Sequence, residues 1–362
     1  MTSTHHAYHI AFFPNGKGDA AICLRYKTSN GYQIMIYDGG TAETGKEMVS
    51  YICDTFQTDE IEDVICSQPS LDHASGLEFV LQNLKVRQLW MHRPWNYSRI
   101  IEAHVNGAYF DPALVAHFAQ HIDGIRRLDN LARQKNIPVT EPFQGAKIGP
   151  MTVMSPSRDW YARVLIPEFE TPALVQRTVA PEVDYLLYRA GEQIKRRPAP
   201  AIAVMPESWK AETLPEWGKV RAEMESSVVL FGRIGHQGIL FTGNAGIKAL
   251  HNTATYAESQ RLLIPFHLRY MQVPNHGHRH HLSPFVLDRL VGPKLSEPIV
   301  APWLTAFVFA SEKTRPDQCV INALIRRGAE VAFVNDSRHQ AHCFTQDHTD
   351  TSAEMLMFQE DL

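Results

Sequence analysis

Short apolar runs separated by turn-forming residues dominate the start of the chain and predict a sheet. The runs "AYHIAFF", "DAAICLRY" and "YQIMIYD" are rich in apolar and aromatic residues, and the turn-forming stretches "PNGKGD", "TSNG" and "DGG" bound them. Apolar residues at helical spacing then predict one helix over residues 43–57 and another over 74–84. Strands are predicted over 61–67, before the second helix, and over 86–92, after it.

The middle of the chain is predicted to be helical and then irregular. Residues 98–136 carry apolar side chains at helical intervals, residues 151–156 have the composition of a strand, and a helix is predicted over 157–165. Residues 165–225 show no consistent period and contain the proline-bearing stretches "KRRPAPA" and "MPESWKAETLPEW". We therefore expect an irregular insertion there that runs over the surface.

A second half repeats the alternation of strands and helices. Two strands flank a glycine-containing turn within 226–244, and a strand, a polar loop and a helix are predicted within 269–292. Ser283 is the expected N-cap of that helix and Pro284 its first residue. The remaining predicted elements are a strand over 298–303, a helix over 318–329 and a strand over 330–335. This order favours an α/β, four-layer αββα sandwich, in which two mixed sheets pack face to face with helices outside.

The composition fits a soluble globular protein. Of the 362 residues, 44% are hydrophobic and 20% are charged, which allows a large buried core. No run reaches the ~18 apolar residues that span a bilayer, and the first residues lack the pattern of a secretion signal. The five cysteines are scattered without a CxxC pair, which favours a reducing compartment. We therefore expect a cytoplasmic protein that does not associate with membranes.

Net charge and histidine content exclude few classes of function. The net charge is −4, which gives no global attraction to the phosphates of nucleic acid, although a local basic groove is compatible with it. The 18 histidines cluster in "NHGHRHHL" (275–282) and "RHQAHCFTQDHTD" (338–350). Such clusters can take up metal adventitiously, so their abundance alone does not indicate a metal site.

Six motifs carry a resemblance to a known family. They are "FPNGKGDAAICL", "IMIYDGG", "VICSQPSLDHASGL", "ILFTGNAG", "MQVPNHG" and "INALIRRGAEV", and each lies at or near the end of a predicted strand. In this order they resemble the metallo-β-lactamase fold, and the branch that they resemble most is that of soluble relatives of the C-terminal domain of the ComEC competence protein. The resemblance implies a sandwich of metallo-β-lactamase type as a single domain over 7–345, with the insertion at 165–225 inside it and a C-terminal tail at 346–362.

The resemblance also implies where a metal centre would lie. Active members of the family usually bind two ions. A Thr-His-x-His-x-Asp-His loop supplies two histidines to the first ion and its closing Asp-His to the second. A later Asp in a Thr-Gly-Asp turn bridges both ions, and a last His comes from a Val-Pro-His-His-Gly loop. Imidazole and carboxylate suit zinc, and the water between the ions becomes the nucleophile.

This sequence departs from that pattern at four positions. Gln68 and Ser70 stand where the first two histidines belong. Asn244 stands where the bridging Asp belongs, and Asn275 replaces the first His of the last pair. Gln and Ser are weak neutral ligands for zinc, and a neutral amide cannot supply the charge that holds two cations close together. The resemblance therefore implies degenerate ligand positions and one ion at most.

What is left of the pattern allows a single metal ion, zinc or manganese, or none. Asp72 and His73 match the second metal position and His276 matches the last histidine, with the Asn244 carbonyl oxygen as a further candidate ligand. Three ligands and a water can make a mononuclear catalytic site, in which Asp72 and His73 would be the catalytic residues. His92 is a candidate for the family's mid-chain histidine.

Each of these residues also has a structural explanation. Asp72 can cap the helix that follows it, and His73 can be held by hydrogen bonds. Asp19 and Asp38 match family positions that tie loops beneath the metal site, and turn chemistry alone also explains an Asp beside a Gly. We expect structural roles for Asp19 and Asp38.

Other polar side chains are candidates for binding an anion. Four of them lie in the loop before the helix at Ser283: His278, Arg279, His280 and His281. A phosphate near that helix start would also gain from its exposed N–H groups. A second group comprises His92, Arg93, Trp95 and Tyr97, whose aromatic and guanidinium groups can stack on bases. A solvated loop and core packing are the alternative explanations.

Three functions are therefore in play. The leading hypothesis is a catalytically inactive or weak member of the fold, a pseudoenzyme that acts as a binding or scaffolding subunit with a protein partner. The first alternative is a mononuclear metal-dependent phosphodiesterase, in which a bound hydroxide attacks phosphorus and nearby cations stabilise the developing charge. The second is a metal-free module that binds a nucleotide or nucleic acid.

Overall fold

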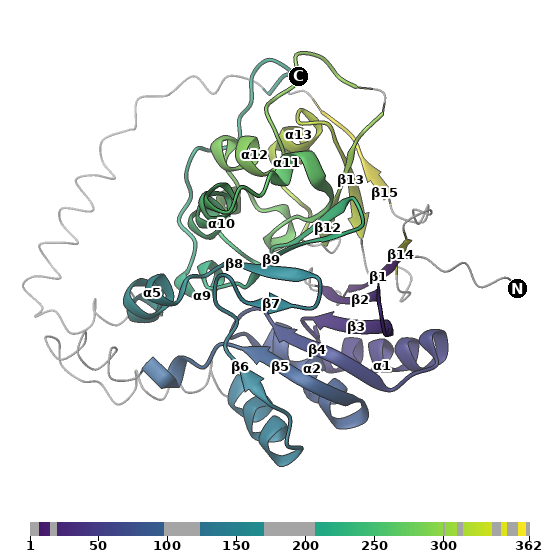
Figure 1. Cartoon of the computed structure of the whole chain (residues 1–362). Helices are drawn as coiled ribbons and strands as arrows, with labels where there is room; N and C mark the ends of the chain where they lie inside the picture. Colours follow the sequence, from purple (N-terminus) through teal and green to yellow (C-terminus); the bar gives the residue numbers. More distant parts are fainter. Residues whose placement is uncertain are drawn as a thin grey trace, which may run out of the picture.

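Two mixed sheets form the centre of the computed structural model, and helices cover their outer faces (Figure 1). The structure describes residues 7–14, 20–97, 124–169, 207–299, 301–309, 314–334, 342–345 and 354–359. The predicted four-layer αββα arrangement is confirmed. Of the other predicted regions, residues 98–123, 170–206 and 346–353 lie outside the described residues, so the single-domain boundaries stay a prediction.

The first sheet joins the strands predicted at the start of the chain. In spatial order it contains β14 (His342–Thr345), β1 (Tyr8–Pro14), β2 (Ala20–Thr28), β3 (Gly31–Tyr37), β4 (Glu60–Cys66), β5 (Lys85–Met91) and β6 (Val139–Thr140). The pairs from β14 to β3 are antiparallel and those from β3 to β6 are parallel. The loops after β3 and β4 therefore leave the sheet at the same edge.

The second sheet is built in the same mixed way. Its order is β15 (Glu354–Leu356), β13 (Ala329–Val334), β12 (Leu304–Phe309), β11 (Leu268–Gln272), β10 (Gln237–Phe241), β9 (Val229–Ile234), β8 (Met151–Ser155) and β7 (Lys147–Ile148). β10 to β13 are parallel. β15 pairs antiparallel with β13, so part of the predicted C-terminal tail belongs to this sheet.

Helices follow the strands that they cover. They are α1 (Ala42–Phe56), α2 (Leu71–Asn83), α5 (Arg158–Trp160), α6 (Ile166–Glu168), α9 (Ala222–Glu225), α10 (Ile247–Ser259), α11 (Ile264–His267), α12 (Pro284–Leu290) and α13 (Gln318–Ile325). Residues 124–134 are also helical. Shorter turns are η1 (Pro94–Tyr97), the π-helix η2 (Tyr161–Leu165), η3 (Asn275–Gly277) and η4 (Arg279–His281). None of the helices in the described part of the chain is long and apolar enough to cross a membrane.

Three apolar clusters fill the spaces between the four layers. Between the sheets, the rings of Phe12 and Phe307 lie 4.6 Å apart, centroid to centroid. A second cluster packs α1 and α2 on the first sheet, and a third packs α10, α12 and α13 on the second. Burying apolar area stabilises such layers by roughly 25 cal/mol per Å², and the apolar runs that predicted the strands supply this area.

The loop after β3 lies directly on the first turns of α2. Gly39 N donates to His73 O over 2.8 Å, and Gly76 N donates to Gly40 O over 3.0 Å. A Cβ atom on Gly76 would lie only 1.9 Å from the carbonyl oxygen of Gly39. Only glycine tolerates so close a backbone approach, so the motif "DGG" and the glycine of "HASG" fix this loop against the helix.

Two details of the secondary structure differ from the sequence predictions. The strand predicted over 298–303 is wrong: the residues from 301 to 303 form bends and turns, and β12 begins at Leu304. Pro298 and Pro302 flank that stretch and cannot donate to a sheet. The structure also adds α10, which the sequence analysis did not predict. By contrast, Ser283 caps α12 as predicted, because its side chain accepts from Val286 N.

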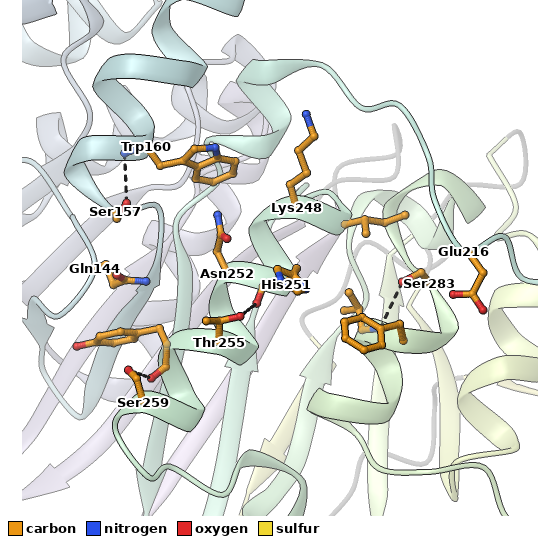
Figure 2. Close-up of a pocket in the computed structure, with 14 residues that line it drawn as sticks. Gln144, Ser157, Trp160, Glu216, Lys248, His251, Asn252, Thr255, Ser259 and Ser283 are labelled. Carbon is orange, nitrogen blue, oxygen red and sulfur yellow. Dashed lines mark hydrogen bonds between the residues drawn. The ribbon is translucent and has the colours of Figure 1, made fainter.

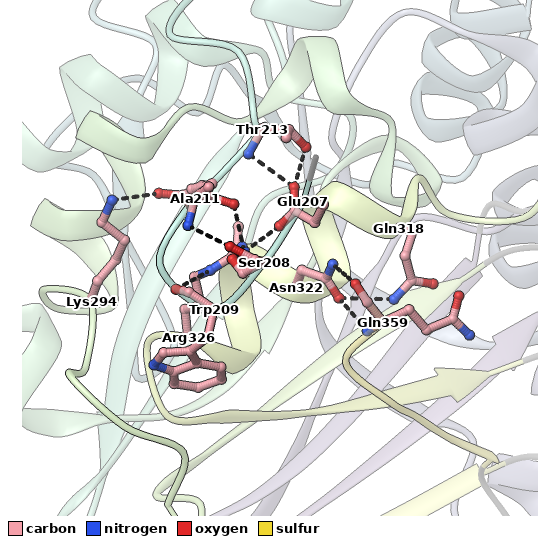
Figure 3. Close-up of polar contacts among 12 residues, drawn as sticks. Glu207, Ser208, Trp209, Ala211, Thr213, Lys294, Gln318, Asn322, Arg326 and Gln359 are labelled. Atoms are coloured by element: carbon pink, nitrogen blue, oxygen red, sulfur yellow. Dashed lines mark hydrogen bonds and ion pairs between the residues drawn. The ribbon is translucent and has the colours of Figure 1, made fainter. Parts of the chain in front are cut away.

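A pair of buried arginines ties the end of the irregular region to α13. Figure 3 shows Arg326 against Glu207 and the carbonyl oxygens of the following residues; the Nη2 atom lies 2.5 Å from Glu207 Oε1. Its neighbour Arg327 is bonded to Glu212 at 2.7 Å and to Asp288 at 2.8 Å. We call residues 207–213 with these two arginines the arginine clasp. Its ion pairs explain how an irregular segment is held on the second sheet's helices.

Candidate functional site

Polar residues meet where the parallel strands of both sheets end. Asp38 follows β3, Ser67 follows β4, Asn244 follows β10 and Asn275 follows β11. The carboxyl ends of parallel strands are the usual place for a binding or catalytic site in an α/β protein. The sequence therefore brings the expected positions together, and what they do depends on their contacts.

Asp38 holds the loop after β4 and the first turn of α2. Its Oδ1 accepts from Ser67 N and its Oδ2 from Ser67 Oγ, both over 2.7 Å. The same Oδ2 lies 2.8 Å from His73 Nδ1. Asp38 is 1% exposed and has a φ of 61°, a conformation that the bonds to Ser67 and His73 over-determine. Asp19, the other aspartate of this kind, lies outside the described residues.

His73 is hydrogen-bonded at both ring nitrogens. Since a carboxylate only accepts, Nδ1 carries the hydrogen and donates to Asp38. Nε2 then holds a lone pair, and the side-chain nitrogen of Asn244 lies 3.1 Å from it. We call Asp38, Ser67, His73 and Asn244 the His73 cluster. All four side chains are buried, which strengthens these bonds and makes each expensive to leave unmade.

His281, much later in the chain, repeats this arrangement. Its Nδ1 lies 3.1 Å from the carbonyl oxygens of both Asn244 and Ala245, so Nδ1 donates. Nε2 lies 2.8 Å from the side-chain nitrogen of Asn275. Burial lowers the pKa of His281 to about 4, which keeps the ring neutral near pH 7. We call Asn275 and His281 the His281 cluster. The anion contact predicted for His281 disagrees with its 4% exposure.

The remaining members of the histidine loop point outward. His276 is half-buried with a φ of 59°, and its Nδ1 lies 3.1 Å from Phe309 O. His278, Arg279 and His280 are exposed. The charge of Arg279 is already balanced, because Asp317 Oδ2 accepts from its backbone N over 2.7 Å and lies 3.4 Å from Nε. An anion site at these exposed residues stays a prediction.

Other predicted site residues lie around α2. Ser70, not Asp72, is the N-cap of that helix, although its side chain makes no cap bond. Asp72 is half-exposed in the first turn, where a negative charge favours the helix dipole. Gln68 is buried, and its Oε1 accepts from Ser227 Oγ over 3.2 Å. Gln68 therefore serves as an acceptor inside the protein.

His92 is buried, and Arg93 is paired with a carboxylate. His92 is 3% exposed, its ring stacks on Tyr161 with centroids 4.4 Å apart, and neither ring nitrogen has a hydrogen-bond partner. Burial, with a smaller contribution from Arg158, lowers the pKa of His92 to about 3. Arg93 is paired with Asp129, its Nε lying 2.8 Å from Oδ1. Their roles in anion binding stay a prediction, and any anion would have to compete with this burial and pairing.

A metal ion does not fit the residues of the His73 cluster. Zinc would need the Nε2 lone pair of His73, and the Asn244 amide already donates to that lone pair. In the part of the chain that the structure describes, no three His, Cys, Asp or Glu side chains are grouped as they would be around a metal ion. The predicted single-ion set of Asp72, His73, His276 and Asn244 is therefore not assembled in this arrangement.

Comparison with known proteins adds fold similarities only. No protein-family model and no curated protein sequence matches the chain. A solved hydrolase, AbOPH of the beta lactamase superfamily, is 9% identical with a TM-score of 0.32, covering 62% of this chain and 55% of its own. A mutant of CmlA beta-hydroxylase is 11% identical with a TM-score of 0.42, covering 93% of this chain and 54% of its own. This chain thus spans about half the length of these two proteins.

A third similar structure is closer to this chain in length. It is a metallo beta lactamase from Hirschia baltica, 13% identical with a TM-score of 0.25, and the match covers 66% of this chain and 74% of that one. The description of AbOPH places it in the beta lactamase superfamily, and the Hirschia baltica protein is described as a metallo beta lactamase. None of the three similarities assigns a residue or a reaction to this chain.

Proposed function

We propose that this chain is a degenerate metallo-β-lactamase-fold protein that acts as a cytoplasmic binding subunit of a protein complex rather than as a metal hydrolase. The single observation that carries the proposal is the 3.1 Å contact between the Asn244 amide nitrogen and His73 Nε2. The bond occupies the atom that a catalytic metal would require. The resemblance to the ComEC branch and its degenerate ligand positions are part of the proposal.

The physical chemistry of the substitutions supports this proposal. A metal at His73 would have to break the buried hydrogen bond from the Asn244 amide to Nε2, and the loss of such a buried bond costs about 1–3 kcal/mol. No anionic ligand is present at position 244 to repay that cost, because Asn is neutral. Gln68 is engaged with Ser227, and Ser70 is a helix cap. Loss of ligands on an intact scaffold is what a retired metal site should look like.

The test measures metal and activity in the same sample. Protein purified without a histidine tag is analysed for bound metal, before and after incubation with Zn²⁺ or Mn²⁺ and removal of free ions. Hydrolysis of bis(4-nitrophenyl) phosphate is followed in parallel. We expect well under one ion per chain and no turnover above a boiled control.

The mononuclear phosphodiesterase is the outcome that would overturn the proposal. It requires about one ion per chain together with turnover, both lost in Asp72→Ala and in His73→Ala. Glu43→Gln, which changes an exposed carboxylate on α1, is the matched control and should leave both unchanged.

Nucleic-acid binding without metal is the other alternative, and the exposed His278 and His280 favour it. Fluorescence anisotropy with a labelled single-stranded oligonucleotide tests it directly. Binding that weakens steeply with salt and is lost in the double variant His278→Gln, His280→Gln would replace the protein partner in the proposal by nucleic acid.

A further inference from the structure

A groove crosses the solvent face of α10, opposite the residues that this helix buries. Its volume is about 630 Å³, within the range of about 300–1,000 Å³ that accommodates small ligands. Figure 2 shows Lys248, His251 and Asn252 along the helix, with Trp160 on one side; Phe285 also lines the groove. The groove does not include the His73 cluster, so its function is independent of any metal there.

One wall of the groove is an aromatic pair that Arg289 holds in place. The rings of His251 and Phe285 are nearly parallel, at 26°, with centroids 5.7 Å apart. Arg289 lies over Phe285 at 5.4 Å, and its Nη1 is 3.1 Å from His251 Nδ1. Since a guanidinium only donates, Nδ1 accepts and Nε2 carries the hydrogen. The wall therefore offers aromatic faces and an N–H donor, although Phe285 is 54% exposed to solvent.

Lys248 supplies the positive charge at the start of α10. The first N–H groups of the helix are already used, since Lys248 N and Ala249 N donate to the Glu225 carboxylate over 3.3 and 2.8 Å. An anion in the groove would therefore meet the Lys248 ammonium and not the helix end. Among the described residues, no carboxylate forms an ion pair with that ammonium, and its side chain is exposed.

Two amides add directional hydrogen bonds. Gln144 Nε2 donates to Met154 O over 2.8 Å, and Gln144 lines the groove. Asn252 carries both a donor and an acceptor, and Figure 2 shows these two amides on the same side of the groove as Trp160. Aromatic walls, mixed amide edges and the Lys248 ammonium are complementary to a flat ring with polar edges and a negative charge. The Glu216 carboxylate also lines the groove, and the charge of Lys248 acts on Glu225 as well.

We propose that this groove binds a planar aromatic ring that carries one anionic group. The ring packs on the aromatic walls at Trp160 and Phe285, and the anion lies at Lys248. The proposal goes beyond the function proposed above and would survive its failure, because the groove on α10 contains none of the residues of the His73 cluster.

Isothermal titration calorimetry tests the proposal with three probes: AMP, indole-3-acetate and 4-nitrophenyl phosphate. Adenosine and ribose 5-phosphate are the half-ligands that lack the charge and the ring, respectively. We expect at least one aromatic anion to bind at one site per chain, more weakly at high salt, and both half-ligands to bind less tightly than AMP if AMP is the one bound.

Two variants localise the binding. Lys248→Gln should raise the Kd about three- to fivefold, as expected for one exposed charge pair of up to about 1 kcal/mol. Phe285→Leu should raise it about tenfold, since stacking contributes about 1–3 kcal/mol. Lys27→Gln, an exposed lysine on β2, is the matched control, and circular dichroism checks that all three variants fold. The proposal is overturned if no probe binds, or if both groove variants bind as the control does.

Discussion

The side-chain amide of Asn275 donates to Nε2 of His281 over 2.8 Å. Asn244 and His73 make the same contact over 3.1 Å. In both pairs an asparagine stands where the resemblance places a metal-binding residue, and a neutral histidine accepts its hydrogen bond. Hydrogen bonds within the chain therefore occupy the positions at the carboxyl ends of the strands where a metal would bind in the family. The first prediction concerns one of these bonds.

Asn244→Ala should lower the free energy of unfolding by about 1–3 kcal/mol, because it removes the buried hydrogen bond to Nε2 of His73. The measurement is urea unfolding at neutral pH. Asn83→Ala removes an exposed amide on α2 that bonds only to its own helix, and it should cost a few tenths of a kcal/mol. Equal effects in the two variants would contradict a stabilising role for the Asn244–His73 bond.

His92 should make the protein less stable in acid. Its folded pKa is about 3, below the unfolded value of about 6.5. The unfolded chain therefore binds the proton first, and stability is lost as the pH falls below that unfolded value. Between pH 6.5 and 4 this amounts to about 3 kcal/mol, at about 1.4 kcal/mol per pH unit. His92→Phe should flatten the fall of Tm with pH, whereas His236→Gln, in the exposed turn after β9, should leave it unchanged.

Glu225 should change the stability in the opposite direction with pH. Burial raises its pKa to about 6 from an ordinary value of 4.5, so the folded protein binds the proton more tightly than the unfolded chain. Stability then falls as the pH rises from 4.5 to 6, by about 2 kcal/mol. Glu225→Gln should remove this slope in unfolding curves taken across that interval. A slope identical to that of the wild type would show that another group titrates there.

The arginine clasp should control access to residues 207–213. Arg326→Met removes the cation that pairs with the buried Glu207 carboxylate, although Thr213 N still donates to Oε2. Breaking a buried ion pair costs about 3–5 kcal/mol. Trypsin should then cut after the exposed Lys210 faster than in the wild type, at a temperature where both remain folded. Arg87→Met breaks a surface pair with Glu62 and should change neither the cleavage rate nor the stability by more than about 1 kcal/mol.

The sequence predicts most of the layers because short apolar runs between turn-forming residues mark the buried strands. It also places Asp38 and His73 at strand ends that a parallel sheet brings together. It could not reveal the bond between Asn275 and His281, because this depends on left-handed conformations at Asn275 and His276, with φ of 42° and 59°. The burial of His92 was equally hidden, since Tyr161, which covers it, lies far along the chain.

The last described residues contact α13 and the arginine clasp. Asn322 on α13 donates to Gln359 O over 2.6 Å and accepts from Gln359 N over 3.0 Å, while the ring of Phe358 lies 4.9 Å from the Arg326 guanidinium carbon. Phe358 and Gln359, which follow β15, thus pack beside the arginine clasp. Shortening the chain to residue 353 would remove β15 from β13, Gln359 from α13 and Phe358 from Arg326. A label or fusion is therefore better attached beyond residue 359 than in place of these residues.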